Sequence, residues 1–237
     1  MDKGLWPTIV DLFKNPKHVP ESFIKGITVK YMHPFRFFFF MVTINAFLIL
    51  WSNELDVVLN MTQSFQKSQS ENVLKQEILN IQRDAFGYLN LFMAGSLPFL
   101  ALGVKWFFSK KKYNYAETLI IATYGFGQFT LVSIILNGLI ILFPSKFLTL
   151  YIINFLLSFV YFIYYFYSVF RQFLLKVIVK GILVYVMWVI SYTMLMGAFM
   201  VVKIIPKAKE YIKEKKLEKE QEKNQNSEAT DLFLNNI

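Results

Sequence analysis

The chain has 237 residues, of which 55% are hydrophobic, 18% aromatic and only 17% charged. Ordinary soluble domains have about 25% charged residues, so this composition excludes a disordered chain and argues against a soluble globule. With no Cys and two His, the chain cannot form disulfides, zinc ribbons, iron–sulfur clusters or a thiol nucleophile. The composition therefore indicates an integral membrane protein.

The N-terminal segment, residues 1–34, is predicted to be cytoplasmic and interfacial. Leu5, Trp6, Ile9, Leu12 and Phe13 fall on one face of an amphipathic helix flanked by lysines, which suits the headgroup region of a bilayer. The alternative is a short helix packed beneath a bundle. The segment contains no apolar run, so nothing in it resembles a cleaved signal peptide.

Five apolar stretches follow, each long enough to cross a hydrocarbon core, for which a helix needs about 20 residues. They cover residues 35–52, 88–108, 117–143, 147–170 and 181–202. None has an ionised side chain near its middle. The sequence therefore predicts an all-α fold, a multi-pass transmembrane helical bundle over residues 35–202.

Two polar segments flank or interrupt this domain. The loop over residues 53–87 is predicted to hold an amphipathic helix, because Leu74, Ile78, Ile81 and Ala85 recur at helical spacing. This helix would cap the bundle or mediate self-association. Residues 203–237 alternate Lys and Glu and are predicted to form a charged helical tail, with a solvated helix from Pro206 to about Lys223.

The orientation follows from the basic residues of the short connecting segments. Most of them lie on the cytoplasmic side if the N-terminus is cytoplasmic, although the lysines of the tail then lie outside. We expect a multi-pass protein of the bacterial inner (cytoplasmic) membrane with its N-terminus inside. The basic residues suit anionic headgroups better than nucleic acid.

The fourth stretch carries the sharpest pattern, a row of polar-tipped side chains at steps of three and four. These are Tyr151, Asn154, Ser158, Tyr161, Tyr165, Ser168 and Gln172. Secondary polar positions in the first and third stretches are Asn45, Thr123, Gln128, Thr130 and Asn137. Polar groups facing lipid are unfavourable, so the row should either pack helices together, within one chain or between copies, or line a water-filled path.

No catalytic pattern accompanies these polar positions. The sequence has no phosphate-binding glycine loop, no HExxH motif and no nucleophile paired with a base. His18 and His33 share one segment without a further ligand, which is a poor metal site. Glu117 lies near Lys110–Lys112 and is interpreted as an interfacial ion partner. We predict a protein that is not an enzyme and has no cofactor or metal.

Residues Pro16, Gly26, Lys30, Tyr31, Pro34 and Phe35 follow the pattern of a family of multi-pass bacterial proteins. In this segment the chain resembles domain of unknown function family 3667, which is common in Bacteroidota. A second family pattern resembles residues 113–119, Tyr-Asn-Tyr-Ala-Glu-Thr-Leu. Ile27, Thr28 and Thr118 depart from the family residues, and a Cys-rich N-terminal ribbon is lacking. The resemblance implies a helical inner-membrane bundle and no activity.

The leading functional hypothesis is a non-enzymatic, self-associating membrane protein that acts as a pore-type or scaffold component. One version is a membrane effector or accessory of bacterial antiviral defence, by analogy of size and topology alone. The alternative is a carrier or transporter of a small molecule or lipid. The expected partners are anionic lipid headgroups, further copies of the chain, and a protein bound through the N-terminal segment or the tail, without direct nucleic-acid binding.

Overall fold

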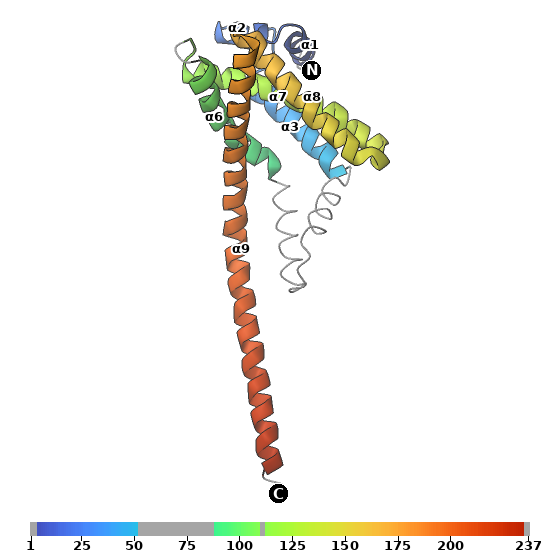
Figure 1. Cartoon of the computed structure of the whole chain (residues 1–237), viewed down its shortest axis with the longest axis vertical. Helices are drawn as coiled ribbons and strands as arrows, with labels where there is room; N and C mark the ends of the chain where they lie inside the picture. Colours follow the sequence, from blue (N-terminus) through green and yellow to red (C-terminus); the bar gives the residue numbers. More distant parts are fainter. Residues whose placement is uncertain (1–3, 52–87, 110–111, 235–237) are drawn as a thin grey trace. The chain divides into compact units, whose positions relative to one another are not determined.

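The computed structural model describes residues 4–51, 88–109 and 112–234, which are helical and contain no strand. The helices are α1 (Leu5–Lys14), α2 (His18–Ile24), α3 (Pro34–Trp51), α6 (Leu89–Val104), α7 (Tyr115–Leu142), α8 (Phe147–Phe170) and α9 (Leu174–Leu234) (Figure 1). A π-helical turn, η1 (Lys105–Ser109), follows α6, and a 3₁₀ turn, η2 (Pro144–Lys146), joins α7 to α8. The predicted all-α fold is confirmed.

Five of the described helices are long and apolar enough to cross a membrane. Their candidate spans are Pro34–Trp51, Leu91–Phe108, Tyr115–Leu142, Pro144–Phe170 and Leu174–Lys203. The predicted multi-pass membrane protein is thereby confirmed. The fifth span begins earlier than predicted, because Lys176 and Lys180 lie inside the helix rather than before it. Long Lys side chains can reach the membrane edge while their backbone continues as helix.

Local sequence explains where these helices begin and end. Pro34 occupies the first position of α3, where its missing N–H costs no hydrogen bond. Asn114 caps α7: its side chain accepts from the Glu117 N–H at 2.8 Å, and Glu117 Oε2 accepts from the Asn114 N–H at 2.7 Å. This capping box fixes the start of α7, so Glu117 serves as a helix cap in addition to any interfacial role.

The chain divides into two compact units, residues 1–68 with 86–195, and residues 69–85 with 196–237. In the second unit the structure describes residues 196–234, which are helical on both sides of Pro206. The predicted helix start at Pro206 is therefore wrong, since an interior proline removes one backbone hydrogen bond without ending this helix. The helix predicted within residues 53–87 lies outside the described residues.

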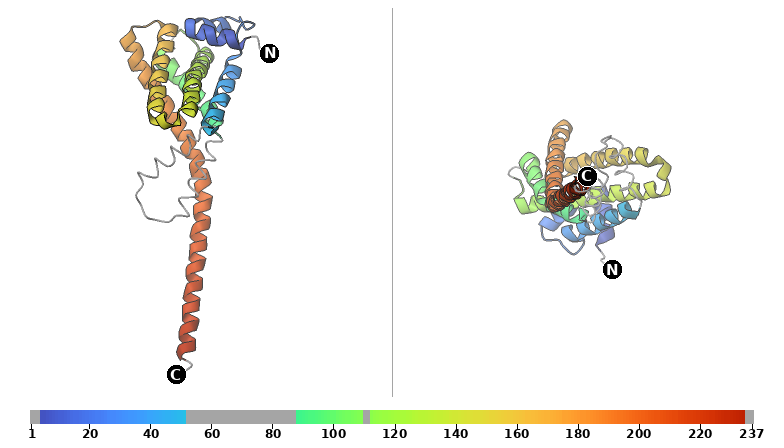
Figure 2. Two further views of the ribbon diagram at one scale, coloured as in Figure 1. Left: turned by 90° about the vertical axis from the view of Figure 1, so that its right-hand side faces the viewer. Right: turned by 90° about the horizontal axis from the view of Figure 1, so that it is seen from below.

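Within the first unit, α7 is the central helix and packs against α2, α3, α6 and α8 (Figure 2). Large aromatic side chains fill the contacts between α7 and its neighbours, including the fully buried rings of Phe37 on α3, Tyr165 on α8 and Tyr124 on α7 itself. Gly125 and Gly127 have no side chain, which lets two of these rings approach the α7 backbone. A Cβ added at Gly125 would lie 2.5 Å from Tyr165 Cε1, and one added at Gly127 would lie 2.8 Å from Phe37 Cδ1.

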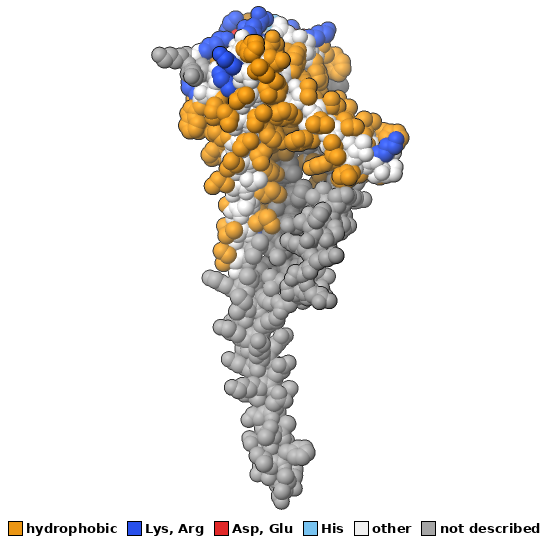
Figure 3. Space-filling model, in the orientation of Figure 1, with side chains coloured by type: hydrophobic (Ala, Val, Ile, Leu, Met, Phe, Trp, Pro, Cys, Tyr) orange, Lys and Arg blue, Asp and Glu red, His pale blue; other side chains and the backbone are white. Residues whose placement is uncertain are grey.

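The outer surface of the first unit is apolar, as expected for helices in contact with lipid. Hydrophobic side chains cover most of the face shown in Figure 3, and Lys and Arg gather at the end where α1 and α2 lie. Exposed large side chains occur on α3, α7, α8 and α9, for example Phe39, Ile135, Leu156 and Val186. The described part of the bundle therefore has an apolar belt with a basic rim at one end.

The predicted amphipathic helix α1 uses its apolar residues in two directions. Leu12 is fully buried and Leu5 and Ile9 pack against the core, whereas Trp6 is 73% exposed and Phe13 is 39% exposed. The five side chains share one helical face, as predicted, but the face is divided: Leu5, Ile9 and Leu12 pack under the bundle, whereas Trp6 and Phe13 remain outside. This division suits a helix lying between the bundle and a membrane surface.

Candidate functional site

The polar row of α8 bonds to other parts of the same chain. Ser158 and Tyr165 are buried, Asn154, Tyr161 and Ser168 are half-buried, and Tyr151 is 50% exposed. Gln172 lies beyond the end of α8, in the turn to α9, so its predicted place on the helix face is wrong. There Nε2 donates to the Phe108 carbonyl at 3.3 Å, and Oε1 accepts from Lys180 Nζ at 2.6 Å.

A continuous set of hydrogen bonds, here called the Asn–Ser network, joins α3, α7 and α8. Asn154 Nδ2 donates to Asn137 Oδ1 at 3.0 Å, and Asn137 Nδ2 donates to Asn45 Oδ1 at 3.0 Å. On the other side, Ser158 Oγ donates to Asn154 Oδ1 at 3.1 Å and lies 3.4 Å from Ser133 Oγ. Three apolar helices are thus held in register by amides and hydroxyls that have no other favourable partner in lipid.

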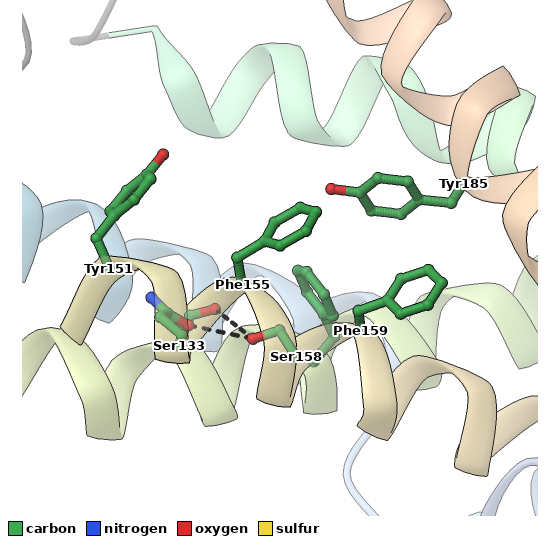
Figure 4. A pocket seen from close by; sticks show the side chains of 8 residues that line it. Ser133, Tyr151, Phe155, Ser158, Phe159 and Tyr185 are labelled. Atoms are coloured by element: carbon green, nitrogen blue, oxygen red, sulfur yellow. Dashed lines mark hydrogen bonds between the residues drawn. The ribbon is translucent and has the colours of Figure 1, made fainter. Parts of the chain in front are cut away.

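A cavity of about 150 Å³ lies beside the Asn–Ser network, between α7, α8 and α9. It is lined by Phe129, Ser133, Tyr151, Asn154, Phe155, Ser158, Phe159 and Tyr185. Figure 4 shows Tyr185 of α9 pointing toward Phe155 of α8, with the Ser133–Ser158 contact beneath. The cavity combines aromatic walls with a floor of neutral polar groups, and no ionisable acid or base lines it.

At the opposite end of α8, tyrosine hydroxyls bond to the N-terminal cap, defined here as residues 4–33 with α1 and α2. Tyr161 donates to the Leu12 carbonyl and Tyr164 to the Phe13 carbonyl, each at 3.2 Å. From α7, the Tyr124 hydroxyl donates to the Met32 carbonyl at 2.6 Å. Three phenols therefore satisfy backbone carbonyls of the cap that would otherwise lack partners.

Two carboxylates organise the cap itself. Asp11 accepts hydrogen bonds from Lys30 Nζ at 2.8 Å and from the Tyr31 hydroxyl at 2.7 Å. Glu21 accepts from the Tyr113 hydroxyl at 2.8 Å, which ties the cap to the start of α7. The hydrogen bond from Lys30, followed by that from Tyr31, lowers the pKa of the Asp11 carboxyl below its ordinary value.

This lowered pKa predicts how the cap responds to pH. The stabilisation is present above the pKa that Asp11 has in the unfolded chain, and it is lost as the pH falls through the lower pKa of the folded state. We expect the protection factors of the α1 amides, which divide the intrinsic exchange rate at each pH by the observed rate, to be high at pH 7 and pH 5 and lower at about pH 3. Asp11→Asn should raise exchange at pH 7 by about fivefold, as measured by mass spectrometry.

Lys25→Gln is the matched control for this prediction, because Lys25 is exposed and bonds to no other described side chain. It should leave the exchange of α1 unchanged at all three pH values. Equal exchange in Asp11→Asn and in the parent protein at pH 7 would show that Asp11 does not hold the cap.

The secondary polar positions divide into three kinds. Asn45 and Asn137 belong to the Asn–Ser network. Thr123 and Thr130 are buried, but their hydroxyls donate to carbonyls of their own helix, at 2.7 and 2.9 Å, and so join no helices. Gln128 is fully buried, and neither its Nε2 nor its Oε1 has a partner among the described residues.

Several residues of these sites escaped the sequence interpretation. Ser133 lies four positions before Asn137 and hence on the same face of α7, a spacing that could have identified it. Tyr185 and Tyr124 carried no such signal, because isolated tyrosines in an apolar helix resemble core residues. Asp11 becomes recognisable only once Lys30 and Tyr31 are brought to it by the turn between α2 and α3.

Each of the two histidines has its own neighbours in the cap. His18 Nδ1 lies 2.9 Å from Ser22 Oγ, and the His33 ring packs on Phe23 and Phe35. Over the described ranges, no three His, Cys, Asp or Glu side chains come close enough to hold a metal ion.

Long apolar helices joined by an interior polar network define a multi-pass integral membrane protein of unknown function. Residues 2–45 match the family described as Protein of unknown function (DUF3667), which confirms the resemblance in this segment. The matched segment comprises the cap and the first part of α3, whereas residues 113–119 lie outside it. No curated protein and no solved structure matches the chain significantly.

The cap geometry accounts for the family residues. Lys30 and Tyr31 hold Asp11, and Pro34 begins α3. Gly26 has φ +86°, a backbone conformation that residues with a Cβ rarely adopt. Four of the six residues that carried the resemblance therefore fold the cap or join it to the first span.

Proposed function

We propose that the chain is a non-enzymatic membrane scaffold whose spans hold the N-terminal cap at one surface of the bilayer. The observation that carries this proposal is the use of polar side chains in the spans. The Asn–Ser network joins α3, α7 and α8, and Tyr161 and Tyr164 of α8 bond to the cap. These bonds position helices and cap, and none of them requires a ligand or a chemical step.

The same bonds favour packing over a water-filled path along α8. Tyr165, near the middle of the predicted polar row, is buried and donates to the Ile121 carbonyl at 2.7 Å. Asn154 and Ser158 bond to each other and Asn154 to Asn137. A second copy would accordingly have to pack against another surface, such as the apolar outer face of α8, and self-association stays a prediction.

The cap suits the cytoplasmic surface of a bacterial inner membrane. The cap carries exposed lysines, including Lys14, Lys25 and Lys30, and the exposed aromatic side chains Trp6 and Phe13. Basic residues attract anionic headgroups and aromatic residues favour the interface. Anionic lipid is therefore the partner we propose for this surface, with the cap or the charged tail available to a protein partner.

An ion-flux measurement tests the scaffold against the pore. In liposomes we expect the wild-type protein to conduct no more K⁺ than empty vesicles, because the polar row is used within the chain. A pore lined by α8 would instead conduct, and the double variant Asn154→Leu with Ser158→Leu would lose that flux. Wild-type conductance that the double variant abolishes would refute the scaffold proposal.

An accessory role in bacterial antiviral defence is one specific version of the scaffold proposal. It rests on analogy of size and topology alone. The genes that neighbour the coding sequence are the observation that tests it, since an accessory of this kind should be encoded beside a nuclease.

A further inference from the structure

We propose that the cavity between α7, α8 and α9 binds a neutral amphiphile dissolved in the membrane, whose head group is a single ring that carries carbonyl oxygens. The cavity volume is about 150 Å³. An apolar cavity of about this size in another protein admits benzene, so a six-membered ring fits without rearrangement.

The lining residues define the charge of the occupant. Over the whole lining there is no Asp, Glu, Lys, Arg or His. A charged head group would have to leave water or the headgroup region without a compensating partner, which is strongly unfavourable. The occupant is therefore neutral.

Hydrogen-bond donors of the lining that have no partner define the polar groups of the occupant. Tyr151 and Tyr185 line the cavity, and their hydroxyls bond to no residue that the structure describes. Ser133 and Asn154, which also carry donors, lie on the same lining. Donors in a low-dielectric site seek acceptors, and carbonyl oxygens are acceptors that a neutral molecule can bring.

The walls define the shape of the head group. Phe129, Phe155 and Phe159 line the cavity together with the Tyr185 ring. Tyr185 meets Phe155 and Phe159 edge-on, with centroid distances of 6.4 and 5.9 Å. Such walls favour a flat ring that offers faces and edges to neighbouring aromatic side chains.

The entry route is lateral, from the bilayer. Tyr151 is 50% exposed and Phe155 is 54% exposed, and both belong to a candidate span. An alkyl tail attached to the ring can remain among the lipid chains while the head group enters between α8 and α9. This is why a membrane-dissolved amphiphile is favoured over a water-soluble ligand.

A decyl-substituted 1,4-benzoquinone is a probe that meets these requirements, and Trp188 can report its binding. The Trp188 and Tyr185 ring centroids are 5.7 Å apart. Trp6, Trp51 and Trp106 are 73%, 66% and 60% exposed, so all three can be replaced by Phe to leave one fluorophore. With the full-length protein in maltoside micelles, we expect saturable quenching of Trp188 by the quinone.

Decylbenzene has the same ring and tail without carbonyl groups, and it should not displace the quinone. Tyr151→Phe combined with Tyr185→Phe should weaken quinone binding by about 25-fold, from about fivefold for each lost hydrogen bond. Because these hydroxyls have no partner in the free protein, the double variant should unfold at the temperature of its parent. Tyr167→Phe, which removes an exposed hydroxyl of α8 outside the cavity, should bind the quinone as tightly as the parent.

Three results would overturn the proposal. They are quenching that does not saturate, displacement of the quinone by decylbenzene at equal concentration, and an affinity of the folded double variant within twofold of the parent. This test is independent of the scaffold proposal. A protein that conducts ions in liposomes could still bind the quinone, and a protein that conducts no ions could fail to bind it.

Discussion

Gly125→Ala is expected to destabilise the bundle by about 3 kcal/mol, which is near the upper end for overpacking a core. The new Cβ would lie 2.5 Å from Tyr165 Cε1 and 2.9 Å from Cδ1. The ring cannot move aside cheaply, since Tyr165 is 1% exposed and its hydroxyl donates to the Ile121 carbonyl at 2.7 Å. Equilibrium unfolding in mixed detergent micelles measures the change.

Gly138→Ala is the matched control, because it makes the same substitution in the same helix where an added Cβ meets nothing within 4 Å. It should leave stability unchanged or raise it by up to about 1 kcal/mol through helix propensity. In a Tyr165→Leu background, Gly125→Ala should cost less than about 1 kcal/mol, since the clashing ring is gone. A full cost in that background would show that Tyr165 is not the obstacle.

Asn137→Leu is expected to cost about 2 kcal/mol, because it leaves Asn45 and Asn154 without their shared partner. Asn137 donates to Asn45 Oδ1 and accepts from Asn154 Nδ2, both at 3.0 Å, and Asn45 is 5% exposed. A single hydrogen bond between membrane helices contributes about 0.6 to 2 kcal/mol, and buried groups left unpaired add a penalty.

Two further variants test whether the cost of Asn137→Leu comes from unpaired amides of the Asn–Ser network. Thr130→Val should cost less than about 0.5 kcal/mol, because its hydroxyl bonds only to the Phe126 carbonyl of its own helix. Replacing Asn45, Asn137 and Asn154 together by Leu should recover part of the loss, since no amide of the network is then left unpaired. A triple variant less stable than Asn137→Leu would mean that the asparagines contribute through packing rather than through pairing.

Hydropathy alone located the spans, because the requirement to bury backbone hydrogen bonds in lipid leaves apolar helices as the available solution. The beginning of α9 was misplaced for a specific reason, that Lys176 and Lys180 interrupt the apolar composition without interrupting the helix. The start of α7 could be predicted only from the pairing of Asn114 with Glu117 as a capping box. The sequence interpretation considered the charge of Glu117 and not its role as a helix cap.

The polar row of α8 was recognisable from its spacing, but its partners were not. Periodicity places Asn154 and Tyr161 on one face, whereas their acceptors on Asn137 and Leu12 depend on which helices become neighbours. Thr123 and Thr130 were predicted to be polar packing positions, but they join no helices. Their hydroxyls donate to backbone carbonyls of the preceding turn of the same helix. Helix packing, which a single sequence does not encode locally, decides between these outcomes.

The hydrogen bonds of the cap have a consequence for the order of folding during synthesis. Its acceptors at Met32, Leu12 and Phe13 find their phenol donors 92, 149 and 151 residues later in the chain. A ribosome delivers the donors of α8 only after the apolar helices α3, α6 and α7 have been translated. The segment with the family match therefore leaves the exit tunnel before the helices that complete its contacts.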